Sequence, residues 1–250
     1  MEQPTTVAQA IAVQEELRGL VECVDVGTPP QYVAGLDVAY DGDRLAAAVV
    51  VLDGATLAEV DRVVVRGETT FPYVPGLFAF REVPALLAAL EQLGTTPELL
   101  VCDGQGLAHP RRFGLACHLG VLTGIPAIGA AKTTFVGSHG SHGELARERG
   151  ATAELVDDGE VVGAAVRTQD GIKPIYVSVG HRVTLATAVA HVLRLTPRYR
   201  LPETTRRADR ACRDGLSDGW AGWGGFLADS GVEPSPTSSA AGEEAAEDEG

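Results

Sequence analysis

Two aspartates stand where apolar segments of the chain give way to polar residues. Asp37 interrupts the stretch from Gly35 to Ala39, and Asp103 directly follows the apolar run 99–102. An unpaired charge in an apolar strand is costly, so such a carboxylate is tolerated where it binds a metal or meets a base. Ligand sites in α/β proteins collect at the carboxyl ends of strands, and two hard oxygen donors suit Mg²⁺ or Mn²⁺ better than zinc. We therefore predict a divalent-metal site here; a solvent-exposed aspartate at a strand end is the competing interpretation of Asp37.

A third acid, Glu82, lies in an apolar helical segment just after the loop Thr70-Phe-Pro-Tyr-Val-Pro-Gly76. Two prolines fix their φ angles, so this loop is rigid. A rigid loop can insert an aromatic ring such as Tyr73 into a base stack, or offer it as a stacking face for an extruded base. The competing interpretations are an exposed helical glutamate and a tyrosine that fills the core.

Basic and imidazole side chains follow the same strand ends. His109, Arg111 and Arg112 come shortly after Asp103, and arginines at the start of a helix could meet phosphates. Lys132 follows one predicted strand, and His181 ends another. Each alone is a weak signal, because a histidine at a strand end is more often structural. The glycine-rich phosphate loop and the dinucleotide-binding fingerprint are both absent.

The hydrophobic pattern predicts the elements that must position these side chains. Helices are expected over residues 5–20, 77–93, 112–123 and 184–195, and strands over 32–39, 45–52, 57–66, 99–102, 127–129, 161–168 and 174–179. The arginine-rich stretch after residue 195 is expected to be irregular. Three strands joined by short turns, followed by alternating helices and strands, indicate an α/β domain with a mixed sheet.

Composition narrows the class of protein. The 250 residues are 45% hydrophobic and 22% charged, with 20 basic against 34 acidic residues and a net charge of −14. This is a globular composition. No apolar run approaches the ~18 residues of a membrane helix and no signal peptide is visible, so we expect no membrane association and a cytoplasmic location. Four scattered cysteines indicate reduced thiols.

Taken together, these stretches resemble one family, endonuclease V, the nucleases that repair deaminated bases. The resemblance runs over about residues 32–207, in the family's order. It is carried by Ala34-Gly-Leu-Asp-Val-Ala39, Pro72-Tyr-Val-Pro-Gly76 with Phe80-Arg-Glu82, Asp103-Gly-Gln-Gly106 with His109-Pro-Arg-Arg112, Ile128-Gly-Ala-Ala-Lys132, Gly180-His-Arg-Val183 and Tyr199-Arg-Leu-Pro-Glu203-Thr-Thr-Arg206. Gln105 stands where many members have histidine, which leaves every carboxylate in place.

The resemblance implies a ribonuclease H-like mixed sheet flanked by helices. It also implies a Mg²⁺-dependent nick, with Mn²⁺ able to substitute, at the second phosphodiester bond 3′ to deoxyinosine in DNA. The products carry a 3′-hydroxyl and a 5′-phosphate. Asp37, Asp103 and Glu82 would form the metal site, and His181 and Lys132 would assist near the scissile phosphate. Tyr73, Pro75 and Gly76 would contact the DNA as the wedge loop, and His109, Arg111 and Arg112 would bind its backbone.

We expect residues 1–228 to form a single nuclease domain that acts as a monomer. The segment 229–250, which carries seven acids and no base, is expected to be a disordered tail. Three alternatives remain open at this point. They are an endoribonuclease of the same family acting on inosine in RNA, a sugar kinase or ATPase-type protein, and a non-catalytic binder of deaminated nucleic acid.

Overall fold

One mixed β-sheet runs through the computed structural model, which describes residues 3–27, 29–139, 145–217 and 227–229. Within these ranges the sheet has nine strands in the order β6-β7-β8-β5-β4-β1-β2-β3-β9. The elements are α1 (Val7–Arg18), β1 (Tyr32–Asp41), β2 (Arg44–Asp53), β3 (Glu59–Glu68), α2 (Ala79–Leu90), β4 (Leu99–Cys102), α3 (Leu115–Thr123), β5 (Ala127–Ala131), β6 (Thr152–Asp157), β7 (Glu160–Val166), β8 (Ile175–His181), α4 (Leu185–Leu195), α5 (Glu203–Ser217) and β9 (Leu227–Asp229). The predicted α/β class with a mixed sheet flanked by helices is confirmed.

The pairing of the central strands determines where their ends meet. β1, β2 and β3 form the expected antiparallel meander, whereas β1, β4 and β5 are parallel neighbours. β8 then pairs antiparallel with β5. Parallel strands end at the same edge of a sheet, so the residues that follow β4 and β5 lie beside the second half of β1.

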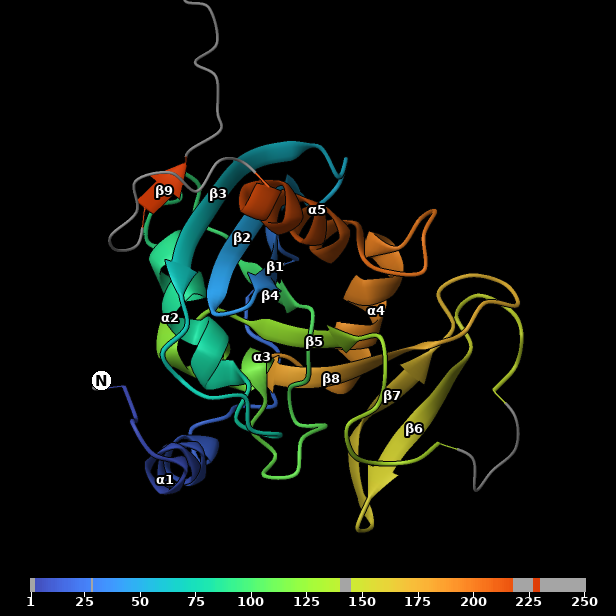
Figure 1. Ribbon diagram of the computed structural model, residues 1–250. Coiled ribbons are helices and arrows are strands. Elements are labelled where there is room, and N and C mark those ends of the chain that lie inside the picture. Colours follow the sequence, from blue (N-terminus) through green and yellow to red (C-terminus); the bar gives the residue numbers. More distant parts are fainter. Residues whose placement is uncertain (1–2, 28, 140–144, 218–226, 230–250) are drawn as a thin grey trace, which may run out of the picture.

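Helices cover both faces of this sheet (Figure 1), with α2 and α3 on one face and α4 and α5 on the other. Alternate residues of β2 serve the two layers. Leu45, Ala47, Val49 and Val51 pack in the cluster with α2 and α3, while Ala46, Ala48, Val50 and Leu52 pack in the cluster with α5. This double burial explains why β2 is an almost unbroken apolar run rather than an alternating one.

Two glycines of the sheet and its loops permit close packing. A Cβ on Gly35 would lie 2.1 Å from the main-chain carbon of Thr204, so α5 can approach β1 only because residue 35 has no side chain. A Cβ on Gly106 would likewise lie 2.0 Å from the main-chain oxygen of Val179. The motif glycines therefore bring the elements close together around the strand ends.

Two predicted elements need correction. The helix expected from residue 112 begins at Leu115, because Arg112 has a left-handed φ of 54° and Gly114 is the N-cap. The segment after Leu195 is not irregular, since α5 occupies 15 of its residues. Its buried face consists mainly of small residues, Thr204, Thr205, Ala208, Ala211, Cys212 and Gly215, which give little apolar signal among the arginines.

The outcome differs among the predictions for the remaining strands, the C-terminal segment, the membrane helices and the cysteines. Strands β6 and β9 were not predicted; β9 includes Asp229, the first residue of the predicted tail, and the tail itself stays a prediction. The rest of the predicted tail, 230–250, lies outside the described residues. No helix in the described ranges is long and apolar enough to cross a bilayer. All four cysteines are free thiols, as predicted.

Candidate active site

Asp37 and Asp103 come together through the parallel pairing of β1 with β4. Leu36 of β1 pairs with Cys102, the last residue of β4. The main-chain N–H of Asp103 then donates to the carbonyl of Leu36 at 3.2 Å, which continues the pairing by one residue. The Asp37 carboxylate is held by a hydrogen bond of 2.8 Å from the main-chain N–H of Val38. The two predicted ligands therefore lie on adjacent strands at one edge of the sheet.

Glu82 approaches the same edge from α2, which packs against β1, β2 and β3. Only 5% of Glu82 is exposed, so the alternative of a solvated helical glutamate is excluded. Burial, followed by the charges of Asp37 and Asp103, raises the pKa of Glu82 well above its usual value. Burial and then the charge of Asp103 likewise raise the pKa of Asp37 to about 7. The three acids are thus electrostatically coupled.

Such a set of buried acids fits a divalent cation by its chemistry. The donors are hard carboxylate oxygens, and their mutual repulsion is a cost that a bound cation would relieve. Across the described parts of the chain, no three His, Cys, Asp or Glu side chains are arranged closely enough to hold an ion as they stand. The acids are therefore electrostatically coupled, but they do not form a closed coordination shell.

Lys132 provides the positive charge nearest to this group. It follows β5, and its Nζ donates to Oδ2 of Asp103 at 2.5 Å. Burial opposes the charge of Lys132, yet the hydrogen bond and charge of Asp103 raise its pKa overall. Lys132 therefore stays protonated and orients one oxygen of Asp103.

A fourth acid, Asp209 of α5, was missed by sequence reasoning. Its charge contributes to raising the pKa of both Asp37 and Lys132, which places it at the same edge of the sheet. Its carboxylate also accepts a hydrogen bond of 2.7 Å from Arg213. The available signal was the helical spacing of small residues from Thr204 to Gly215, which identifies α5 and places Asp209 beside its buried face.

A pocket of about 250 Å³ opens beside the acids. Glu82 and Asp103 line it, together with the aromatic side chains of Tyr73, Phe78 and Phe135. Tyr73 is 69% exposed and meets Phe78 edge-on, with 5.7 Å between ring centroids. Tyr73 is therefore not a core residue, and its stacking on DNA stays a prediction.

The loop that carries Tyr73 is fixed by hydrogen bonds to the carbonyl oxygen of Gly76. Nε2 of Gln14, Nε2 of His109 and a guanidinium nitrogen of Arg111 all lie within 2.6–3.0 Å of this oxygen. Burial, and then the charge of Arg111, lower the pKa of His109 to about 4, so its ring is neutral at pH 7. His109 and Arg111 thus hold the loop in place, and its residues Tyr73, Pro75 and Gly76 line the pocket.

Comparison with known proteins agrees with this arrangement. Residues 15–210 match the family model described as Endonuclease V. The chain is 59% identical to Endonuclease V of Nocardia farcinica over 217 residues, which are 85% of this chain and 94% of that protein. The chain belongs to the endonuclease V family. As a member of this family it is a metal-dependent endonuclease that acts on DNA containing deaminated bases.

Solved structures of the endonuclease V family share the fold. Endonuclease V from Streptomyces avermitilis superposes with a TM-score of 0.82 at 55% identity, covering 86% of this chain and 95% of that one. Endonuclease V from Ciona intestinalis has been solved with a 24mer DNA containing an inosine followed by a ribo-adenosine. It superposes with a TM-score of 0.73 at 28% identity, covering 84% of this chain and 98% of that one. The predicted ribonuclease H-like architecture is thereby confirmed.

Two residues predicted from the endonuclease V resemblance have other partners. Arg112, predicted to bind the DNA backbone, is buried and forms ion pairs of 2.8 Å with Asp157 and 2.9 Å with Glu160, which anchor the β6–β7 hairpin; its contact with DNA stays a prediction. His181 pairs with Ala127, the first residue of β5, whereas Lys132 follows the last. The antiparallel direction of β8 therefore puts His181 at the other end of β5, where its Nδ1 accepts from the N–H of Glu22.

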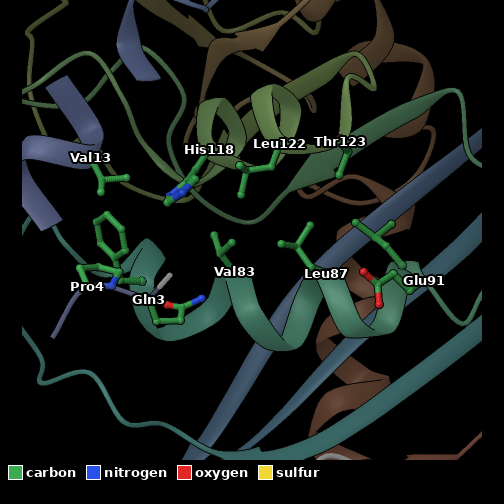
Figure 2. Close-up of a pocket in the computed structure, with 11 residues that line it drawn as sticks. Gln3, Pro4, Val13, Val83, Leu87, Glu91, His118, Leu122 and Thr123 are labelled. Carbon is green, nitrogen blue, oxygen red and sulfur yellow. The ribbon is translucent and has the colours of Figure 1, made fainter. Parts of the chain in front are cut away.

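Another pocket, of about 430 Å³, lies between α1, α2 and α3 and contains none of the four acids. Figure 2 shows His118 pointing into it opposite Val83 and Leu87, with Glu91 at its far end. Burial lowers the pKa of His118 to about 4, and its Nδ1 has no hydrogen-bond partner. Its lining is mostly apolar, has no arginine or lysine, and has a histidine that is neutral at pH 7, so it does not offer the chemistry of phosphodiester cleavage.

Proposed function

We propose that this protein nicks DNA at the second phosphodiester bond 3′ to deoxyinosine and leaves a 3′-hydroxyl and a 5′-phosphate. The observation that supports this most directly is the coupled group of Asp37, Glu82 and Asp103 beside a pocket lined by aromatic side chains. The inosine in the DNA with which the Ciona relative was solved supports the choice of lesion.

The metal would be held by Asp37 and Asp103, with Glu82 as the third acid. Mg²⁺ is the ion we propose, and Mn²⁺ would substitute, because all donors are hard oxygens. A bound divalent ion neutralises the charge of the phosphate and makes water a better nucleophile. Lys132 holds Asp103 in one orientation, and its ammonium lies close enough to the acids to meet a phosphate oxygen.

The remaining roles follow from position. Tyr73 would wedge into the stack beside the lesion, and the pocket behind it would receive the extruded base. His109 and Arg111 would act through the Gly76 carbonyl as positioning residues. We assign no catalytic role to His181; Asp209, which faces Asp37 and Lys132, is the better candidate for orienting the attacking water.

Two further properties belong to the same proposal. Every residue assigned to the site comes from one chain, so we propose that a monomer is sufficient for cleavage; light scattering of the active enzyme tests this. We propose the cytoplasm as its compartment, because four free thiols suit a reducing environment.

The test is a nicking assay on a labelled duplex with a single deoxyinosine, with Mg²⁺, with Mn²⁺ and with EDTA, at low and high salt. Asp103→Asn should abolish the nick, and the exposed Asp41→Asn on the same sheet edge should not. A matched RNA strand with one inosine runs in parallel. Cleavage of the RNA alone would move the protein to the endoribonuclease alternative, and equal activity in EDTA would overturn the metal assignment.

A further inference from the structure

A basic pocket lies apart from the acids, between the turn after β2 and the segment that joins α4 to α5. We call it the arginine pocket. Its volume is about 670 Å³, and its polar lining consists mainly of Arg194, Arg198, Tyr199, Glu203, Arg206 and Arg207. Four guanidinium groups face Glu203, and Glu59 lies 3.6 Å from Arg207 as a second carboxylate, so the local net charge is +2 in a chain whose net charge is −14.

The carboxylate in this pocket neutralises only part of the positive charge. Glu203 accepts two hydrogen bonds of 2.8 Å from Arg206 and one of 3.1 Å from Arg207, which lower its pKa. Among the described residues, the hydrogen bonding of the Arg194 side chain is limited to a long contact of 3.5 Å with Nδ1 of His191. Within the described residues, Arg198 has neither an ion pair nor a hydrogen bond from its side chain. Two guanidinium groups are therefore available to an anion.

The pocket also has an aromatic surface. Tyr199 is 51% exposed, and the guanidinium carbon of Arg206 lies 4.5 Å from its ring centroid. The stacked guanidinium, itself held by Glu203, fixes the orientation of the ring. A fixed exposed ring among arginines is the combination that contacts the sugar–phosphate backbone and bases of nucleic acids.

The position of the pocket relative to the acids is set by α5. Six residues separate Glu203 from Asp209, a distance of about 9 Å along a helix. The connecting segment is held as well, because Arg200 donates to the carbonyl oxygens of Lys132 and Pro174 at 2.8 Å each. Successive phosphates of a strand advance by about 3.4 Å along the duplex axis. The register of β1 with β2 places the turn after Asp53 beside Tyr32, five residues or about 17 Å along β1 from Asp37, so the arginine pocket lies several nucleotide steps from the acids.

We propose that the arginine pocket binds the sugar–phosphate backbone of the substrate several steps to one side of the cleaved bond. This inference rests on the proposed function, because the flanking strand belongs to the same nucleic acid that is nicked. It also assigns backbone contacts to Arg194 and Arg198, whereas Arg112 has internal ion-pair partners.

The experiment compares Arg198→Glu with Arg18→Glu, which makes the same change of charge at the exposed end of α1. Fluorescence anisotropy in EDTA gives the Kd of three inosine duplexes. One has long flanks, and each of the others is cut to about two base pairs beyond the scissile bond on one side. Arg198→Glu should weaken binding of the long duplex by about tenfold and reduce the slope of log K against log salt by about 1. The duplex that lacks the flank reaching the arginine pocket should bind Arg198→Glu and Arg18→Glu with the same Kd.

Three outcomes would overturn the inference. Arg18→Glu could weaken binding as much as Arg198→Glu, which would show a general charge effect. Arg198→Glu could weaken all three duplexes equally, which would show a structural effect. Adenosine monophosphate could bind the wild type and not Arg198→Glu while duplex binding stays unchanged, which would make the pocket a nucleotide site. Nicking of the long duplex by the wild type separates this test from that of the proposed function, because either can fail without the other.

Discussion

Replacing Asp37 by asparagine should inactivate the enzyme and at the same time stabilise its metal-free fold. The amide keeps the oxygen that accepts from Val38, so the backbone contact is preserved. The change removes a negative charge that is buried beside Asp103 and Glu82. The site thus carries an electrostatic cost that the fold bears for the sake of function.

The size of this cost follows from the pKa of Asp37, which burial and the charge of Asp103 raise from 3.8 to about 7. The folded protein binds this proton more tightly than the unfolded chain, so stability is greatest below pH 3.8 and falls as the pH rises to 7. Each pKa unit is worth about 1.4 kcal/mol, so the full cost above pH 7 is about 4 kcal/mol. At about pH 4.5 it is only about 1 kcal/mol.

Urea unfolding in EDTA at about pH 4.5 and pH 8 measures this difference. Asp37→Asn should be more stable than the wild type by about 4 kcal/mol at the higher pH and by about 1 kcal/mol at the lower. Asp41→Asn, at the exposed end of the same strand, is the control and should match the wild type at both. Added Mg²⁺ should stabilise the wild type more than the variant. A stability difference that does not change with pH would refute the reasoning.

Three other changes test separate parts of the structure. His118→Leu removes a buried base whose pKa burial lowers from 6.5 to about 4, and a base with a lowered pKa costs stability as the pH falls from 6.5 to 4. In urea unfolding the variant should therefore gain up to about 3 kcal/mol on the wild type between pH 7 and pH 4. An equal stability difference at both pH values would contradict this. Gln14→Leu leaves the Phe113 carbonyl and Nε of Arg111 without their partner and should cost about 2–3 kcal/mol by the same assay, whereas the exposed Gln92→Leu should cost far less. Tyr73→Ala should lower kcat/KM on an inosine duplex by about 10- to 100-fold with little loss of stability, because the ring is 69% exposed, and Tyr73→Phe should restore activity if stacking is its role.

Much of the site could be predicted from local sequence. An aspartate that interrupts one apolar run and another that follows a second located β1 and β4 and their carboxylates, since strand length and turn signals are encoded within a few residues. The rigid Pro-Tyr-Val-Pro segment predicted an exposed ring, and Tyr73 is exposed. Spacing alone could not show that Glu82 is buried, because its helix turn carries no sign of which face packs on the sheet.

The residues that the sequence misplaced depend on strand direction and on partners far along the chain. His181 and Lys132 both adjoin strand ends, but β8 runs opposite to β5, and this places them at opposite ends. Arg112 reads as a free cation until β6 and β7 bring Asp157 and Glu160 to it. Asp209 reads as one charge in an arginine-rich helix until Gly35 admits α5 against β1.

The sequence by itself determined the α/β class, the family, and the two aspartates and aromatic loop of the site, because these rest on short-range patterns of residue type. Tertiary structure decided which charges meet. It coupled Asp37, Glu82, Asp103 and Asp209, neutralised Arg112, and left Arg194 and Arg198 open to a partner. The reason is physical: the energy of a charge depends on its burial and on the charges within a few ångströms, and both are set by strand order and helix packing rather than by neighbours in the chain.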